Sequence, residues 1–217
     1  MTLLDLSADD VLNTTRAVRK RLDFSRPVDD DLIRECVATA MQAPSGSNNL
    51  TMRFVVVKDP DKRRAIGDLY RECFDIYRQM PFYAGALKKE SIEEQAQQDR
   101  VVDSAGYLAE HMGDAPVLVI GVTSGRAENV PAMAAASMMG NVLPGMWSFM
   151  LAARARGLGT AWTTVGLFKE REIAEIVGLP FDEFQQACLT PLAHTIGTDF
   201  KRAQRPDPDT IIHWDTW

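Results

Sequence analysis

The spacing of apolar residues divides most of the chain into helices and strands. Apolar side chains recur three or four positions apart, the spacing of one helical face, in residues 7–19, 30–42, 62–79, 101–111 and 169–177. Ser7 and Pro27 stand just before two of these segments, and each is followed by aspartates that suit the positive end of a helix. Gly178, followed by Pro180, ends the last of them. The pattern predicts five helices of this kind.

Four shorter runs predict strands. They are rich in β-branched and aliphatic residues and lie at 53–58, 115–122, 161–166 and 185–196. The run 115–122 is apolar without alternation, as expected of a strand that is covered on both faces. A fifth segment, residues 210–214, has strand character near the end of a polar, proline-rich tail.

One long segment, residues 131–156, is rich in Ala, Met and Leu and is apolar nearly all round. A helix without a polar face has to be buried, either in the centre of the protein or in a subunit interface. Pro144 lies inside this segment and has no backbone N–H, so we expect a kink or a break into two helices there.

Bulk composition is that of a globular protein. Hydrophobic residues make up 46% and charged residues 25% of the chain, which excludes disorder. Its 217 residues contain no Pro-, Ser- or Gly-rich linker, so we expect one domain over residues 1–217. The net charge of −6 argues against a general nucleic-acid surface, because affinity for phosphate backbones depends on clustered Lys and Arg. A local basic pocket is compatible with that charge.

Cysteine usage and the N-terminus indicate a cytoplasmic protein. Cys36, Cys73 and Cys188 are far apart and form no CxxC pair, which fits a reducing compartment rather than a disulfide framework or a zinc site. Residues 1–6 lack the basic-then-apolar order of a signal peptide, and no apolar run reaches the ~18 to 20 residues needed to span a bilayer. We therefore expect a soluble protein without a membrane partner.

Two segments carry candidate binding chemistry. The small residues of the loop Ala43–Asn49 let backbone N–H groups approach a ligand, and its Ser and Asn side chains add donors and acceptors. Arg16 and Arg19 are three positions apart, so on a helix they would share a face where two guanidiniums can converge on a phosphate. Taken alone, both signals favour plainer interpretations, a turn and a solvated basic cluster completed by Lys20 and Arg21.

No other constellation competes with these two segments. His111, His194 and His213 are isolated and lack HExxH-like spacing, which favours structural or exposed histidines over metal ligands. The chain has neither GxGxxG nor GxxxxGK[ST], so a Rossmann dinucleotide site and a P-loop are not supported. Ser45 lies in Pro-Ser-Gly-Ser rather than in GxSxG, which argues against a nucleophile elbow.

Several motifs together resemble those of the FMN-dependent nitroreductase family. They are Arg16–Arg19 ahead of Pro27–Val28, the loop Ala43–Asn48 ahead of the strand Phe54–Val57, the helix-to-strand junction Leu151–Thr160, and Lys201–Pro206 ahead of a tryptophan-containing end. Their order and spacing carry the resemblance, which runs from about Val11 to Trp217.

The resemblance implies an α+β fold. This is a three-layer α-β-α sandwich with a mixed, mostly antiparallel central sheet flanked by helices, in a homodimer that exchanges a C-terminal strand. Residues 80–98 would be a variable lid over the flavin, in which Phe82 and Tyr83 either stack on a planar substrate or pack on the surface. Residues 198–217 would form a C-terminal extension that adds a strand to the partner's sheet.

The resemblance also implies a set of cofactor-binding residues. They are Arg16, Ala17, Arg19, Pro44, Ser45, Ser47, Asn48, Thr163, Thr164, Val165, Gly166, Arg202 and Arg205. Arginines from both chain ends would hold the FMN phosphate, and the serine-rich loop would contact the phosphate, the ribityl chain and the ring edge. The turn at 163–166 would offer a backbone N–H near flavin N5, which favours the reduced ring.

The implied activity is that of an FMN-dependent NAD(P)H oxidoreductase. Hydride would pass from NAD(P)H to flavin N5 and then, in a ping-pong reaction, to a nitroaromatic, a quinone or a similar small planar acceptor. No side chain is assigned to catalysis and no metal is implied. Alternatives are dehalogenation or flavin fragmentation on the same fold, or a flavin-sequestering protein without turnover. Leu50, Met52, Trp147, Ser148 and Ala17 depart from the family pattern and concern mainly the ring contacts and the substrate pocket.

Overall fold

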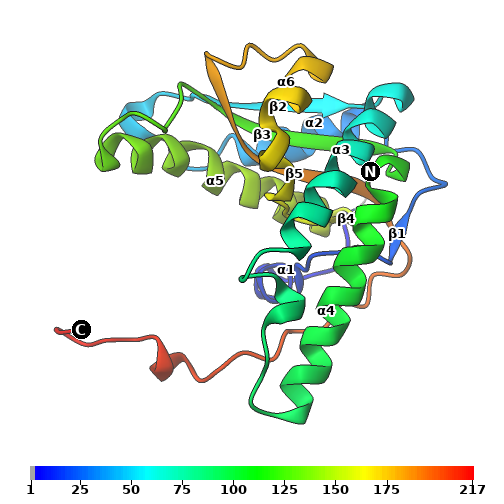
Figure 1. The fold of residues 1–217 in the computed structure, drawn as a ribbon, viewed down its shortest axis with the longest axis vertical. Coiled ribbons are helices and arrows are strands. Elements are labelled where there is room, and N and C mark those ends of the chain that lie inside the picture. Colours follow the sequence, from blue (N-terminus) through cyan, green and yellow to red (C-terminus); the bar gives the residue numbers. More distant parts are fainter. Residues whose placement is uncertain (1–2) are drawn as a thin grey trace.

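The computed structural model describes residues 3–217, in which six α-helices surround a five-stranded sheet (Figure 1). The helices are α1 (Ala8–Thr14), α2 (Asp30–Ala40), α3 (Pro60–Arg78), α4 (Ile92–His111), α5 (Ala132–Ala155) and α6 (Glu170–Val177). The strands are β1 (Leu22–Asp23), β2 (Met52–Val57), β3 (Val117–Ser124), β4 (Leu158–Thr160) and β5 (Phe184–Thr195).

The sheet has the order β1-β5-β3-β2, and β4 also pairs with β5. All of these pairings are antiparallel, and the one parallel contact recorded between residues 3 and 217 is an isolated bridge from Ala17 to Thr160. β2 is an edge strand in the single chain, which leaves one row of its backbone groups without a strand partner.

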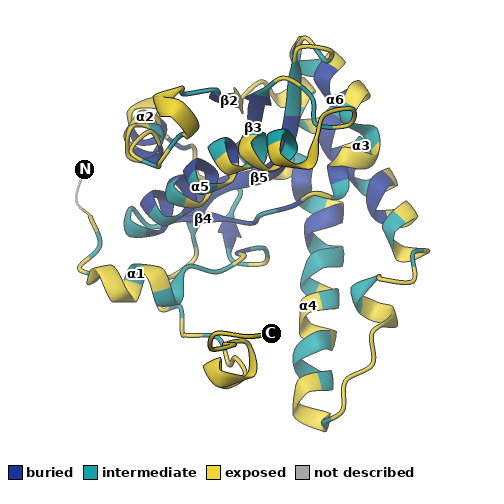
Figure 2. Cartoon of the chain, turned by 90° about the vertical axis from the view of Figure 1, so that its left-hand side faces the viewer, coloured by how far each residue is buried: buried dark blue, intermediate teal, exposed yellow. Residues whose placement is uncertain are grey.

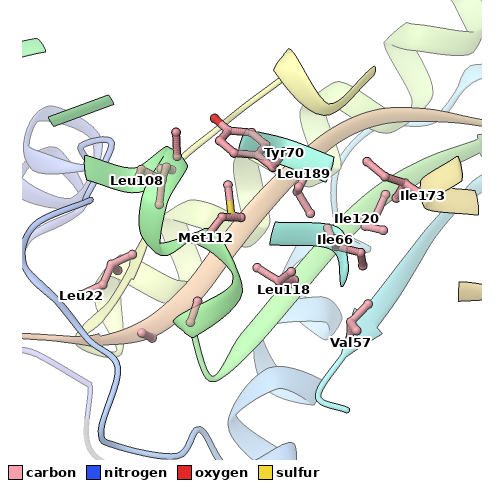
Figure 3. Packing of buried hydrophobic residues seen from close by; sticks show 14 of the residues in the cluster. Leu22, Val57, Ile66, Tyr70, Leu108, Met112, Leu118, Ile120, Ile173 and Leu189 are labelled. Carbon is pink, nitrogen blue, oxygen red and sulfur yellow. The ribbon is translucent and has the colours of Figure 1, made fainter. Parts of the chain in front are cut away.

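Neighbouring residues of β3 point to opposite faces of the sheet and so build two apolar cores. Leu118 and Ile120 pack in a core with α3, α4 and α6, which Figure 3 shows from close by. Val117 and Val119 pack on the other face, against α2 and α5. Figure 2 shows these strands and the inner helix faces as the buried part of the molecule. The expected α+β fold with helices on both faces of a sheet is confirmed.

The first helix is shorter than predicted, because α1 ends at Thr14 rather than near Arg19. The hydroxyls of Thr14 and Thr15 donate to main-chain carbonyls four residues earlier, a contact that competes with helix continuation, and Thr15 is already extended. The prediction that Arg16 and Arg19 share a helical face was therefore wrong.

Two further boundaries differ from the prediction. α4 begins at Ile92 instead of near residue 101, because Ser91 and Glu94 form a capping box there. The strand expected at 161–166 lies earlier, at β4, and Val165–Lys169 form a short 3₁₀ helix.

α5 is one continuous helix, so of the two expectations for Pro144, a kink or a break into two helices, the break was wrong. Val142 and Met146 flank the proline and are fully buried in a core with Met52 of β2. Packing on both sides of Pro144 holds the helix together although one backbone donor is missing.

The C-terminal extension lies on the surface of the single chain. Residues 210–214 form no strand here, and the nearest regular structure is the 3₁₀ turn Pro208–Thr210. Trp214 keeps 79% of its surface exposed and Trp217 is fully exposed. Figure 1 shows this segment in red, leaving the body of the protein. No helix within residues 3–217 combines the length and the apolar character needed to cross a bilayer.

Candidate functional site

A cationic cavity of about 720 Å³ lies between the segment after α1, the middle of α4 and the start of the C-terminal extension. It is lined by Arg16, Ala17, Val18, Arg19, Lys20, Arg21, Arg100, Ser104, Asp199, Phe200, Lys201 and Arg202. Its volume is within the range of small-molecule sites. We call it the cationic cavity.

The sheet positions the N-terminal wall of the cationic cavity. The N–H of Val18 donates to the carbonyl of Thr160 on β4 at 2.8 Å, and the Val18 side chain is buried. This contact fixes the chain between Arg16 and Arg19. The guanidinium of Arg19 then reaches α4, where its Nη1 donates to Ser104 Oγ at 3.3 Å.

Most of the positive charge in the cationic cavity has no carboxylate partner. Lys20 pairs with Asp103 and Arg21 with Asp199. Four other arginines form no ion pair with any carboxylate of residues 3–217; they are Arg16, Arg19, Arg100 and Arg202. Guanidiniums collected without counter-charge favour a bound phosphate or carboxylate.

The pKa shifts agree with a shortage of negative charge. Burial lowers the pKa of Arg16, and repulsion by the neighbouring Arg205 lowers it further. Burial also lowers the pKa of Arg19. Both guanidiniums remain protonated, since free arginine loses its proton only above about pH 12. A bound anion would offset the free-energy cost of burying these two cations, which their lowered pKa values reflect.

The C-terminal arginines reach this region within one chain. Arg202 lines the cationic cavity and an adjoining one of about 370 Å³, which it shares with Arg16, Arg100 and Gln204. Arg205 lines the next stretch of the groove between α4 and the extension. The structure therefore brings together Arg16, Arg19 and Arg202, with Arg205 beside Arg16.

The turn at residues 163–166 does not line the cationic cavity, but Tyr70 lies near both this turn and Arg19. Thr163 is tied to β5, because its N–H and its hydroxyl both donate to the carbonyl of Leu189, at 3.1 and 2.7 Å. The Tyr70 hydroxyl, which points away from Leu118 in Figure 3, lies beside Thr163 and Arg19. Burial raises the pKa of Tyr70 to about 12, so it stays a neutral phenol.

The loop Pro44–Asn48 lies elsewhere, beside the N-terminal half of α5. The N–H of Gly46 donates to Asn141 Oδ1 of α5 at 2.5 Å, and Ser47 and Asn48 both have a left-handed φ of 54°. Such backbone angles are uncommon outside glycine and often occur at ligand sites. None of the loop residues lines the cationic cavity, so one chain does not unite the loop with the arginines.

An apolar groove of about 510 Å³ runs between α2 and the free edge of β2. Leu50 and Met52, two of the departures from the family pattern, line it together with Met41 and Phe54. On the same strand Arg53 folds back, and its Nη1 donates to the carbonyls of Leu50 and Met52 at 2.7 and 2.8 Å.

The predicted lid is anchored on both sides. Tyr83 packs edge-to-face on Tyr77 with ring centroids 5.1 Å apart, and the N–H of Ala84 donates to the Tyr77 hydroxyl. Gln98 of α4 donates to the carbonyl of Ala84. Phe82 remains exposed. Packing is therefore the role that the structure shows for Tyr83.

Arg100 and Ser104 were missed by the sequence analysis. They are four positions apart on α4 and face the same cavity. That spacing was the available signal, but it went unused because residues 80–98 were treated as a lid and the helix was expected to begin only at residue 101.

Other chemistries find no support in residues 3–217. This part of the chain contains no group of three or more His, Cys, Asp or Glu side chains that could hold a metal ion. Burial raises the pKa of Cys36 and Cys73 to about 11 and that of Cys188 to about 12, which disfavours thiolate nucleophiles.

The model of the Nitroreductase family matches residues 12–197, most of the chain. The chain belongs to the nitroreductase family. Among solved structures it is similar to a BluB-like flavoprotein from Clostridium difficile 630, with a TM-score of 0.67 and 19% identity over 96% of this chain and 99% of that one.

Two further structures of similar fold are of proteins that bind FMN or depend on it. One is a point mutant of the FMN- and NADPH-dependent nitroreductase NfnB from sphigopyxis sp. strain HMH, with a TM-score of 0.66 and 22% identity over 98% of this chain and 100% of that one. The other is an iodotyrosine deiodinase bound to FMN and 3-iodo-L-tyrosine, with a TM-score of 0.66 and 19% identity over 96% and 99% of the two chains. At these identities the likeness shows the shared fold.

The residues of this nitroreductase-family chain fit the phosphate end of FMN. The cationic cavity offers several guanidiniums that form no ion pair within residues 3–217, a donor set suited to a phosphate dianion.

Proposed function

We propose that the protein is an FMN-dependent NAD(P)H oxidoreductase that acts on a nitroaromatic, a quinone or a similar small planar acceptor. The observation that carries the proposal is the convergence of Arg16, Arg19 and Arg202 on one cavity without carboxylate partners. When bound, FMN would supply the redox chemistry by taking hydride from NAD(P)H and giving it to the acceptor.

In this proposal the arginines hold the cofactor by its phosphate. Arg16 and Arg202 approach from opposite ends of the chain, Arg19 is held in place by Ser104, and Arg205 lies beside Arg16. Guanidiniums bind phosphate through paired N–H donors, which fix its orientation as well as its charge.

The turn at 163–166 would sit along the flavin ring. The first N–H groups of a helix have no partner within it, so the start of the 3₁₀ helix Val165–Lys169 would have N–H groups available for the flavin. Thr163 is locked to β5 and Gly166 is buried beside Ile173, which keeps this segment rigid. A donor held there would favour added electron density on the ring.

The loop Pro44–Asn48 would complete the site in a homodimer. It lies away from the cationic cavity and is mostly exposed in the single chain, and Ser47 and Asn48 give it a defined left-handed shape. We propose that Ser45, Ser47 and Asn48 of one subunit contact the flavin held by the arginines of the other.

The C-terminal extension would bind the partner subunit. Trp214 and Ile211 are exposed on a segment with strand propensity, and the apolar groove lies beside the unpaired edge of β2. Extended segments commonly add to such edges. We propose that residues 210–214 of one subunit pair with β2 of the other.

Absorbance spectroscopy tests the proposed function. We expect purified protein reconstituted with FMN to be yellow, to bleach when NADPH or NADH is added without oxygen, and to recover its colour when a nitroaromatic is added. A yellow protein that neither nucleotide reduces would instead indicate dehalogenation, flavin fragmentation or flavin storage. A protein that takes up no FMN would refute the proposal.

A further inference from the structure

Arg154, in the last turn of α5, is a buried cation that forms no ion pair with a carboxylate of residues 3–217. Only 4% of its surface is exposed, and its Nε and Nη1 atoms have no hydrogen-bond partner among residues 3–217. Burial and the nearby Arg21 lower its pKa, which Asp10 only partly offsets. A cation at this end of a helix is favoured by the helix dipole. The dipole alone does not compensate for so much lost solvation.

The contacts that Arg154 does make join three segments. Its Nη2 donates to Thr14 Oγ1 at the end of α1 and to the carbonyl of Thr198, both at 3.1 Å. Its guanidinium also lies over the ring of Phe200, 5.1 Å from the centroid, and Arg21 lies over the same ring at 4.3 Å. Phe200 is thus held by two cations and packs against the core.

Arg154 and Phe200 form the last anchor of the chain before the cationic cavity. Within residues 201–217, every recorded hydrogen bond stays inside that segment. Lys201 and Arg202 follow Phe200 directly and line the cavity. The direction in which the extension leaves Phe200 therefore decides whether Arg202 reaches Arg16.

We propose that Arg154 is a positioning residue that fixes Thr198 and Phe200 so that Arg202 points into the cationic cavity. The inference rests on the proposed binding of a flavin phosphate there. Arg154 does not touch the phosphate, since its guanidinium is closed off from solvent. It acts on affinity for the phosphate through Arg202, and it leaves affinity for the flavin ring unchanged.

Arg154→Met tests this role, with Arg156→Met as the matched control. Arg156 lies two residues further along and binds Glu35 on α2, away from the extension. FMN and riboflavin are titrated into each apo protein. The dissociation constant for riboflavin divided by that for FMN measures the contribution of the phosphate to binding. We expect Arg154→Met to shrink this ratio by about tenfold or more, the worth of one hydrogen bond to a charged group. We expect Arg156→Met to leave it unchanged.

A double-mutant cycle shows whether Arg154 acts through Arg202. If it does, Arg154→Met adds little to the loss already caused by Arg202→Ala, because the guanidinium that it positions is gone. Fully additive losses would overturn the proposal. So would an unchanged FMN-to-riboflavin ratio in a folded Arg154→Met protein.

Trypsin cleavage of the apo protein tests the positioning without flavin. We expect cleavage after Lys201 and Arg202 to be several-fold faster in Arg154→Met, because the segment is no longer anchored. Should Arg154→Met fail to fold, Phe200→Leu gives the same test with Arg154 in place, and equal cleavage rates in wild type and that variant would overturn the inference. A wild-type protein that binds FMN and riboflavin equally well would refute the proposed phosphate site, while faster cleavage in Arg154→Met would still support the anchoring.

Discussion

The cationic cavity and the loop Pro44–Asn48 were both expected to bind the same flavin, yet one chain completes only the first. The cavity gathers side chains from two chain ends and α4, and the sheet and Arg154 hold its walls. The loop lies beside α5 and is held by one hydrogen bond to Asn141. The difference shows that residues far apart in one chain assemble the cationic cavity, while under the proposed function the loop would meet the flavin only across a subunit interface.

The largest effect is expected from removing Arg16, which lines the cationic cavity, or Arg205, which lies beside it. Arg16→Ala and Arg205→Ala should each weaken FMN binding by about 1.5 to 3 kcal/mol, because each removes a donor to a charged group. Lys20→Ala is the matched control, since Lys20 lines the cavity but is paired with Asp103. Fluorescence titration of FMN measures the change. Wild-type affinity in both arginine variants would remove the phosphate assignment.

Mixed dimers test the division between the two regions. Arg16→Ala damages the cavity and Asn48→Ala damages the loop, and neither variant alone should retain FMN well. When the two chains are refolded together in equal amounts, about a quarter of all sites should regain FMN, because half of the dimers then hold one intact site of two. The absorbance of bound flavin measures the fraction of sites that hold FMN. No recovery in a dimeric mixture would mean that each chain builds its site alone.

The loop's link to α5 should have a smaller effect. Asn141→Ala removes the acceptor for the Gly46 N–H and should weaken FMN binding by about 1 kcal/mol by loosening the loop. Ser137→Ala is a fair control, because Ser137 lies near Gly46 without a recorded hydrogen bond to it. An equal loss in both variants would show that the Asn141 contact is not specific. Titration with FMN separates the cases.

The smallest effect concerns pH and His194, on β5 between β1 and β4. Burial, followed by the nearby Arg26, lowers its pKa below 6.5, although Asp23 and Asp29 oppose the shift. Because the unfolded state then binds the proton more readily, stability is full above about pH 6.5 and falls as the pH drops below it. We expect a lower Tm at pH 5.5 than at pH 7.5, and a weaker dependence in His194→Gln. An identical slope in that variant would exclude His194 as the cause.

The fold could be predicted largely from local patterns. The continuous apolar run around Leu118 and Ile120 indicated a strand covered on both faces, and it forms the centre of the sheet. Boundaries were less certain where side chains compete with the helix, as the hydroxyls of Thr14 and Thr15 do. The sequence pattern does not show how such local hydrogen bonds end a helix.

The site was predicted in parts. The family resemblance named Arg16, Arg19 and Arg202, and the structure places them together, but by way of the sheet rather than a shared helix face. Arg100 was missed because residues 80–98 were treated as a lid and the helix was expected to begin only at residue 101, so that its spacing from Ser104 on α4 went unused. Contacts between segments far apart in the chain, such as Arg154 with Thr198, require the folded structure.

Arg53 covers part of the unpaired edge of β2. Its guanidinium occupies the carbonyls of Leu50 and Met52, acceptors that an incoming strand would otherwise find vacant. Another chain that approaches this end of β2 therefore finds two acceptors already occupied, which disfavours unwanted edge-to-edge pairing there. A segment that pairs with β2 at this point has to displace the Arg53 side chain first, which slows association of a correct partner as well as of an incorrect one.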